Sequence, residues 1–195
     1  YSEPVCIPQF SQGIEAMSKS SLLLVLGLLT TASAFAATPE AAFLAEHGLS
    51  GKSVEQIVET IDQSPQNRPL PYSASITSTE LKLSSGDQIY TLPLGDKFYL
   101  SFAPYEWQTH PCFNHSLSGC QGEMPEKAFN VKVTDNKGEV MVQKVMKSGR
   151  NGFVGVWLPR NMAGTIAVSY NGKTAEYPIK TMEDSQTCLT KLQLR

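Results

Sequence analysis

The sequence lacks the short motifs that mark several large classes of enzyme. The 195 residues contain no GxGxxG of dinucleotide-binding folds, no phosphate-binding loop and no HExxH of zinc proteases. The cysteines lack the C-x-x-C spacing of thioredoxin-like redox proteins, and no internal repeat or low-complexity tract is present. These absences leave a nucleotide-dependent enzyme, a zinc protease and a C-x-x-C oxidoreductase without support.

A strong charge of either sign is also missing. The formal net charge of the whole chain is −2. Taking away the one basic and two acidic side chains of residues 1–36 leaves 15 basic and 16 acidic side chains, a net charge of −1. The sequence therefore gives no electrostatic basis for binding nucleic acid or an anionic membrane surface.

No apolar run is long enough to span a bilayer, which needs roughly 18 residues. The longest, LLLVLGLL at residues 22–29, follows Lys19 and precedes two small-x-small sites between residues 32 and 36. This order predicts a signal peptide over residues 17–36, with cleavage after Ala36 and no membrane span afterwards. We interpret residues 1–16 as an upstream extension that is not native. Secretion implies an oxidising compartment, in which disulfides persist.

The next segment, residues 37–66, carries the start signals of two short helices. Thr38 is a predicted N-cap, and Ser53 with Gln56 fits a capping box. Apolar residues recur at i, i+3, i+4 and i+7 from Val54, so the second helix has one apolar face. Helices this short are marginal alone in water. We therefore expect this helical region to pack on the rest of the chain or on a second subunit.

Residues 67–195 show a different pattern, of short β-type runs separated by turn residues. Hairpin signals occur at residues 135–139 and at Asn171-Gly172. The pattern predicts a mainly β fold, an antiparallel β-sandwich-like domain after the small helical region. The ten runs are SASITS, ELKLSS, QIYTLPL, KFYLSFA, AFNVKVT, EVMVQKVM, GFVGVWLP, GTIAVSY, KTAEYPI and CLTKLQL.

The longest interruption of the strand pattern contains HPCFNHSLSGCQGE, which holds His110, Cys112, His115 and Cys120. Thiolates are soft ligands that favour Cu(I) and zinc, and imidazole suits zinc and Cu(II). Cys188 lies near the start of the last predicted strand. If that strand pairs inside the sheet, it can bring a third sulfur under the loop. The C-x7-C spacing alone is a weak signal for a metal.

A structural disulfide is the main alternative interpretation of these cysteines. A Cys112–Cys120 bridge would stabilise the fold by roughly 2.5 kcal/mol, and a bridge from either to Cys188 by roughly 4.4 kcal/mol. Three cysteines remain after residue 36, so at least one is left over. A reactive Cys–His pair is a third interpretation, although the sequence shows no third group to orient the histidine. The residues alone leave these alternatives open.

HPCFNHSLSGCQGE, together with DSQTCLTKLQ around Cys188 and FLAEHGLSGKSVEQIVE near residue 50, resembles the CueP family of periplasmic copper-binding proteins. The resemblance runs from Met17 to the last residue. It implies a periplasmic protein that binds Cu(I) through Cys112, Cys120 and Cys188 and contributes to copper resistance. It also implies an N-terminal region that helps to form a homodimer and a larger copper-binding domain over residues 67–195.

The resemblance implies partners as well. It associates the protein with copper delivery to a periplasmic Cu,Zn superoxide dismutase, and with reduction of Cu(II) by thiols that a periplasmic disulfide reductase system restores. We expect His110 and His115 to support the copper ligands from beside them or to capture Cu(II). We also expect zinc to be able to replace copper, and the protein not to be an enzyme. Two rival functions are a thiol–disulfide oxidoreductase and a β-sandwich binding module stabilised by a disulfide.

Overall fold

The computed structural model describes residues 36–195, so the expected extension at 1–16 and the signal peptide up to its last residue lie outside the described residues. Residues 37–195 form one compact unit that is mostly β-strand, with two short helices. The mainly β fold predicted from the sequence is therefore confirmed. Within residues 36–195, no helix is both long enough and apolar enough to cross a membrane.

The two helices begin where their capping residues predict. Helix α1 spans Pro39–Glu46, and the side chain of Thr38 accepts a hydrogen bond from the backbone of Ala41. Helix α2 spans Val54–Asp62 and begins with a complete Ser53–Gln56 capping box. The apolar face of α2 is buried, as the spacing of its apolar residues requires.

The strands form three hydrogen-bonded sheets, with the orders β3-β2-β1-β5, β10-β9-β6-β7 and β11-β4-β8. All pairings are antiparallel except that of β11 with β4, which is parallel. The bounds are β1 Ser73–Ile76, β2 Glu80–Ser85, β3 Gln88–Pro93, β4 Lys97–Phe102, β5 His115–Ser116, β6 Ala128–Asp135, β7 Val140–Lys147, β8 Val154–Pro159, β9 Ala163–Tyr170, β10 Lys173–Lys180 and β11 Cys188–Leu189.

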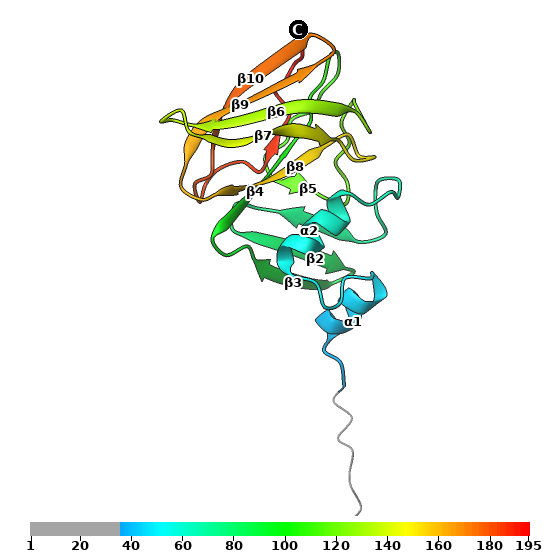
Figure 1. Cartoon of the computed structure of the whole chain (residues 1–195). Coiled ribbons are helices and arrows are strands. Elements are labelled where there is room, and N and C mark those ends of the chain that lie inside the picture. Colours follow the sequence, from blue (N-terminus) through cyan, green and yellow to red (C-terminus); the bar gives the residue numbers. More distant parts are fainter. Residues whose placement is uncertain (1–35) are drawn as a thin grey trace, which may run out of the picture. The chain divides into compact units, whose positions relative to one another are not determined.

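Helices α1 and α2 pack on the sheet that contains β1 and β2 (Figure 1). The helical region thus shares a hydrophobic core with strands on the other side of residue 66. Its predicted role in forming a homodimer stays a prediction. The buried members of this first core are Phe43, Leu49, Ile57, Val58, Ile61, Leu70, Ala74, Ile76, Leu81, Leu83, Leu94, Tyr99 and Leu117.

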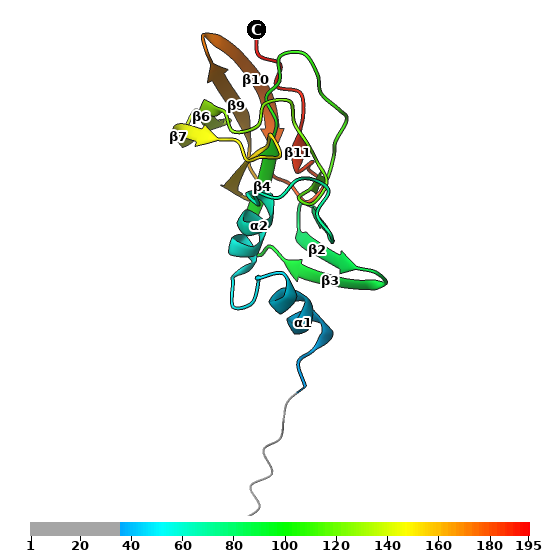
Figure 2. The same ribbon diagram turned by 90° about the vertical axis from the view of Figure 1, so that its right-hand side faces the viewer.

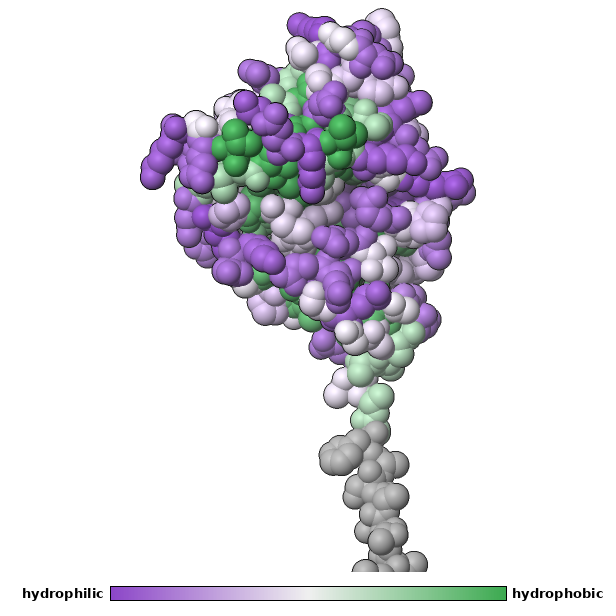
Figure 3. All heavy atoms as spheres, in the orientation of Figure 1, coloured by the Kyte–Doolittle hydropathy of each residue, from purple (hydrophilic) through white to green (hydrophobic). Residues whose placement is uncertain are grey.

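A second core fills the space between the β11-β4-β8 sheet and the β10-β9-β6-β7 sheet, as in a β-sandwich. Figure 2 shows β11 beside β4 at one side of this core. The β9–β10 hairpin turns at Asn171 and Gly172, whose φ angles of 49° and 78° suit the type I′ turn expected there. Figure 3 shows apolar residues among hydrophilic ones over the region of β6 and β7, and β7 carries the exposed Val140 and Val145.

Strand β4 contributes to both cores because successive side chains of a strand point to opposite faces. Phe98, Leu100 and Phe102 enter the second core. Tyr99 and Ser101, on the other face, are buried toward α2 and the long loop that follows β4. Strand β4 therefore supplies two buried hydroxyl groups, those of Tyr99 and Ser101, next to the cysteine-containing loop.

Candidate metal centre

The short strand β5 fixes the middle of the cysteine-containing loop. It pairs with β1, with His115 opposite Ile76. The backbone N–H of His115 also donates to the hydroxyl of Thr187 over 3.0 Å, and this hydroxyl donates to the carbonyl of Ile76 over 2.7 Å. Because Thr187 directly precedes Cys188, the same contacts align the loop with the last strand.

The last strand brings Cys188 under the loop. Strand β11 pairs with β4, with Cys188 opposite Ser101. The backbone N–H groups of Thr187 and Cys188 both donate to the carbonyl of Phe113, over 2.9 and 3.0 Å. The juxtaposition predicted from the strand pattern is therefore present, and Cys188 has no exposed surface.

Four side chains converge at this point. The ligand atoms of Cys112, His115, Cys120 and Cys188 all lie within 4.8 Å of one another. Cys112 and Cys188 form a disulfide, and among residues 36–195 Cys120 is the cysteine left outside it. The Sγ atom of Cys120 lies 3.7 Å from that of Cys112. The disulfide and metal-site interpretations thus apply to the same residues.

His110 lies outside this group of four. One of its ring nitrogens, Nδ1, is 3.2 Å from the carbonyl of Pro111, and the other, Nε2, is 3.1 Å from the carbonyl of Gln121. Because Gln121 follows Cys120, His110 contacts the loop beside the cluster without turning a nitrogen into it. Its predicted role in handling copper stays a prediction.

Asp62, the last residue of α2, is a member of the site that the sequence analysis missed. Its carboxylate has no exposed surface, and its Oδ1 atom lies 2.9 Å from Nε2 of His115. It also accepts hydrogen bonds from the hydroxyls of Tyr99 (2.7 Å) and Ser101 (3.3 Å) and from the amide of Asn151 (2.9 Å). A buried carboxylate needs such partners because its desolvation is costly. One signal could have revealed it: Asp62 follows Val58 by four residues, on the buried face of α2.

Arg68 ties the end of α2 to the loop. Its guanidinium donates to the carbonyls of Ile61 and Asp62 over 2.9 and 3.2 Å. Its Nε also donates to the carbonyl of Leu117, two residues after His115, over 3.0 Å. A cation at a helix C-terminus satisfies carbonyls that have no partner within the helix. Arg68 therefore fixes the end of α2, which carries Asp62, beside the loop segment that carries His115.

The pKa values of the buried groups follow from this arrangement. Burial alone lowers the pKa of His115, but the charge and hydrogen bond of Asp62, together with the smaller effect of Cys120, outweigh burial and raise that pKa to about 9. Burial alone raises the pKa of Asp62, but the charge of His115 and the hydrogen bonds from His115, Tyr99 and Asn151 bring a net decrease. At neutral pH the site therefore contains an imidazolium paired with a carboxylate.

The charged His115 acts in turn on Cys120. Burial alone raises the pKa of the Cys120 thiol, but the hydrogen bond and charge of His115, with a backbone hydrogen bond from Ser116, bring a net decrease. The sequence showed no third group to orient a Cys–His pair, and Asp62 provides one. The chain Asp62–His115–Cys120 stabilises a thiolate, which is the form that binds soft metals and attacks disulfides.

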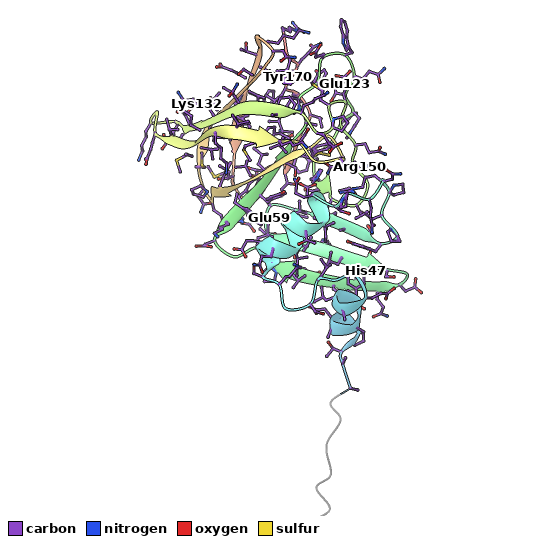
Figure 4. The ribbon with its side chains drawn as sticks, turned by 45° about the vertical axis from the view of Figure 1, so that its right-hand side comes forward. His47, Glu59, Glu123, Lys132, Arg150 and Tyr170 are labelled. Carbon is purple, nitrogen blue, oxygen red and sulfur yellow. A yellow bond between two sulfur atoms is a disulfide. The ribbon has the colours of Figure 1, made fainter. Side chains whose placement is uncertain are left out.

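The first part of the loop is held by Glu123, which is labelled in Figure 4. Its carboxylate accepts hydrogen bonds from the backbone N–H groups of Glu106 (2.6 Å), Trp107 (3.1 Å) and Gln108 (3.0 Å). Burial raises the pKa of Glu123, but these three hydrogen bonds outweigh it and lower the pKa. The loop is therefore ordered by its own polar contacts, although the side chain of Trp107 is 82% exposed.

Three sulfurs and an imidazole held by a mainly β scaffold define a sulfur-rich centre whose reduced form suits a soft metal ion. The family model described as "Periplasmic copper-binding protein CueP" matches residues 56–193, which is more than half of the chain. The chain therefore belongs to the CueP family, a family of periplasmic copper-binding proteins, and the resemblance found in the sequence is confirmed.

A solved structure supports this assignment. The chain is similar to a protein described as "Crystal Structure of S.CueP", with 79% sequence identity and a TM-score of 0.81. The match covers 82% of this chain and 99% of that chain. No curated protein matches the sequence.

Proposed function

We propose that this protein binds copper as Cu(I) through the thiolates of Cys112, Cys120 and Cys188, with Nδ1 of His115 as a fourth ligand. The observation that carries the proposal is the convergence of these four ligand atoms within 4.8 Å. Cys112 and Cys188 are joined by a disulfide, so this ligand set requires that bond to be reduced first.

The chemistry of the ligands fits Cu(I). Thiolate sulfur is a soft ligand, and Cu(I) is a soft ion that accepts few ligands. Cys188 and His115 are fully buried, so the ion would be shielded from water on that side. Three thiolates and one imidazole also form a ligand set typical of structural zinc. We therefore propose that zinc can replace copper.

The same sulfurs can supply electrons to copper. Two thiolates that lose one electron each to two Cu(II) ions yield two Cu(I) ions and one disulfide. We propose this reduction for Cys112 and Cys188, since these residues are the pair that the disulfide joins. The reaction is stoichiometric until a periplasmic disulfide reductase system restores the thiols. In this role the protein is a reductant and not an enzyme.

Other proposals rest on the family resemblance rather than on the geometry of the site. They are a contribution to copper resistance, a homodimeric state, and delivery of copper to a periplasmic Cu,Zn superoxide dismutase. Delivery is tested by mixing the Cu(I)-loaded protein with the metal-free dismutase and following dismutase activity. No gain over a copper-free control would contradict delivery.

The copper site is tested by titrating the reduced protein with Cu(I) against a competing chelator. Serine replacement of Cys112, Cys120 or Cys188 should each weaken binding by at least about tenfold, as should His115→Ala. His47→Ala is a matched control, because His47 packs against Phe43 and Tyr72 and not against the cluster. If all three serine variants keep the affinity of the parent protein, the three-thiolate site is wrong.

Thiol counting in a Cys6→Ser background separates this proposal from a β-sandwich module whose disulfide is purely structural. In that rival, the Cys112–Cys188 bond persists under mild reduction and only Cys120 reacts with a thiol reagent. The copper-site proposal expects three reactive thiols, all of them protected when one equivalent of Cu(I) is bound.

A further inference from the structure

The centre contains three neighbouring sulfurs, two of which are joined by a disulfide. Cys120 Sγ lies 3.7 Å from Cys112 Sγ, which is itself bonded to Cys188 Sγ. Disulfides exchange when a thiolate attacks one of the two bonded sulfurs. The cysteine outside the disulfide is therefore already in contact with a bonded sulfur that it can attack.

The three sulfurs differ in their access to solvent. Cys188 is completely buried in β11, whereas Cys112 and Cys120 are only partly buried on the loop. A thiol from outside the protein can therefore approach the loop sulfurs, but it cannot reach Cys188 directly. An external thiol can therefore open the Cys112–Cys188 bond only by attacking Cys112, and Cys188 itself is reached only from within the protein.

We propose that the protein moves its disulfide internally, from Cys112–Cys188 to Cys112–Cys120. The Cys120 thiolate attacks Sγ of Cys112, a Cys120–Cys112 bond forms, and the Cys112–Cys188 bond breaks. Cys188 leaves with the electron pair as a thiolate. One S–S bond is made and one is broken, so the exchange needs no outside oxidant or reductant.

The surroundings favour both ends of this exchange. Nδ1 of His115 lies 3.8 Å from Cys188 Sγ, within hydrogen-bond reach of the sulfur that leaves. The backbone N–H of Cys120 donates to the carbonyl of Ser116 over 2.9 Å, which anchors the attacking residue beside β5. Asp62 fixes the other ring nitrogen of His115, so the imidazole keeps its orientation. The attacking and leaving sulfurs are thus each held by a fixed neighbour.

The exchange gives each cysteine a distinct role. Cys188 returns to a thiol without being reached from outside, and the oxidised pair is presented on the loop, where a dithiol protein can reduce it. The inference involves the same sulfurs as the proposed copper site and explains how that site could be regenerated. The exchange itself uses no metal, so it can be tested in copper-free protein.

The first test maps the disulfide in the oxidised protein. The full chain carrying Cys6→Ser is equilibrated at neutral pH without copper, acidified to stop exchange, digested with pepsin and analysed by mass spectrometry. We expect two species, one with Cys112 bonded to Cys188 and one with Cys112 bonded to Cys120 and a free Cys188. Detection of the first species alone, with the second below about 1%, would overturn the proposal.

The second test compares the two disulfides in isolation. In the same Cys6→Ser background, Cys120→Ser leaves the Cys112–Cys188 pair and Cys188→Ser leaves the Cys112–Cys120 pair. Equilibration of each with a glutathione buffer should give oxidation constants within about a hundredfold, or about 60 mV at 29.6 mV per tenfold change. A larger gap in favour of Cys112–Cys188 would rule out a populated exchange. Neither result depends on Cu(I) affinity, so this proposal can fail while the copper site stands.

Discussion

At the scale of single residues, Asp62 is the group on which the site most depends. It is buried without any exposed surface and accepts hydrogen bonds from four side chains that come from different parts of the chain. Removing one member of a buried ion pair is costly because it leaves the other charge uncompensated. Asp62 therefore determines both the orientation and the charge of His115.

Asp62→Asn should lower the pKa of His115 well below about 9, since the carboxylate is the largest of the groups that raise it against burial. The affinity of the reduced protein for Cu(I) should fall about 10- to 100-fold, as for other groups that orient a metal-binding histidine. The pKa is measured by NMR titration of the imidazole. Asp87→Asn, at an exposed position in the β2–β3 turn, is the control. An unchanged His115 pKa in Asp62→Asn would contradict this role.

The His115–Asp62 pair also predicts how stability depends on pH. The pKa of His115 is raised on folding, so its contribution is complete below about pH 6.5 and is lost as the pH rises through about 9. With Cys120 present the loss corresponds to roughly 3 kcal/mol, and without Cys120, which also raises this pKa, it should be smaller but of the same sign. Urea unfolding from about pH 6 to about pH 10 measures it in oxidised Cys120→Ser, in which no Cys120 thiolate titrates. Adding His115→Gln should flatten the profile, and an equally steep profile in that variant would assign the effect to another group.

At the scale of elements, strand β8 makes room for the hydroxyl that reaches Asp62. A Cβ atom at Gly155 would overlap the Tyr99 hydroxyl, because Gly155 lies opposite Ser101, two residues from Tyr99 on the same face of β4. Tyr99 uses this space to donate its 2.7 Å hydrogen bond to the carboxylate. The absence of a side chain at Gly155 therefore allows Tyr99 to donate its hydrogen bond to Asp62 in α2.

Gly155→Ala should therefore destabilise the protein by about 1–3 kcal/mol, since overpacking displaces Tyr99 and its hydrogen bond. Tyr99→Phe removes the hydroxyl alone and should cost about 1–3 kcal/mol. A double-mutant cycle from urea unfolding should show the two losses to be less than additive. Strict additivity would mean that Gly155→Ala acts elsewhere in the sheet.

Most elements could be predicted because their signals are local. Capping residues identified both helices, and short β-type runs separated by turn residues identified ten of the eleven strands that the structure describes. Strand β5 has only two residues, so it carries no periodic signal. Its pairing with β1 joins residues about 40 positions apart, and the parallel pairing of β11 with β4 joins residues 87 positions apart, as for Cys188 and Ser101. Such contacts depend on the folded core rather than on neighbouring residues.

The residues of the site, like the elements of the fold, could be predicted from the sequence only where their signals are local. Cys112, His115 and Cys120 could be grouped from the sequence because they lie within nine residues. Asp62 could not, because its donors Tyr99, His115 and Asn151 are 37, 53 and 89 residues away along the chain. A buried carboxylate is recognised by its partners, and those partners come together only when α2, β4 and the loop pack on one another.

At the scale of the whole molecule, the disulfide joins residues that are 76 positions apart. A bridge across a loop of this length stabilises the folded protein by about 4 kcal/mol on the chain-entropy model. Reduction in the absence of metal should lower the free energy of unfolding by about this amount, as measured by urea unfolding with and without a reductant. Cys120→Ser, which keeps the bridge, should match the parent protein when oxidised. Equal stability of the oxidised and reduced forms would contradict the prediction.

Cu(I) should then restore stability to the reduced protein, because a ligand that binds only the folded state stabilises it. At about 1,000 times the dissociation constant the gain is about 4 kcal/mol. Thermal unfolding of the reduced protein with and without Cu(I) measures this gain. The triple serine variant of Cys112, Cys120 and Cys188 should show none, and an equal gain in that variant would place the bound copper elsewhere.

The centre draws on Asp62 near the start of the compact unit and on Cys188, 126 positions later. A growing chain that has been made only as far as Thr187 already contains both loop cysteines and His115, but it lacks the third sulfur and the strand that aligns the loop. Such a chain therefore holds Cys112 and Cys120 without their final partner. If the loop cysteines are oxidised together before the last strand docks, the bond between them is Cys112–Cys120, and exchange with Cys188 then gives the native Cys112–Cys188 bond.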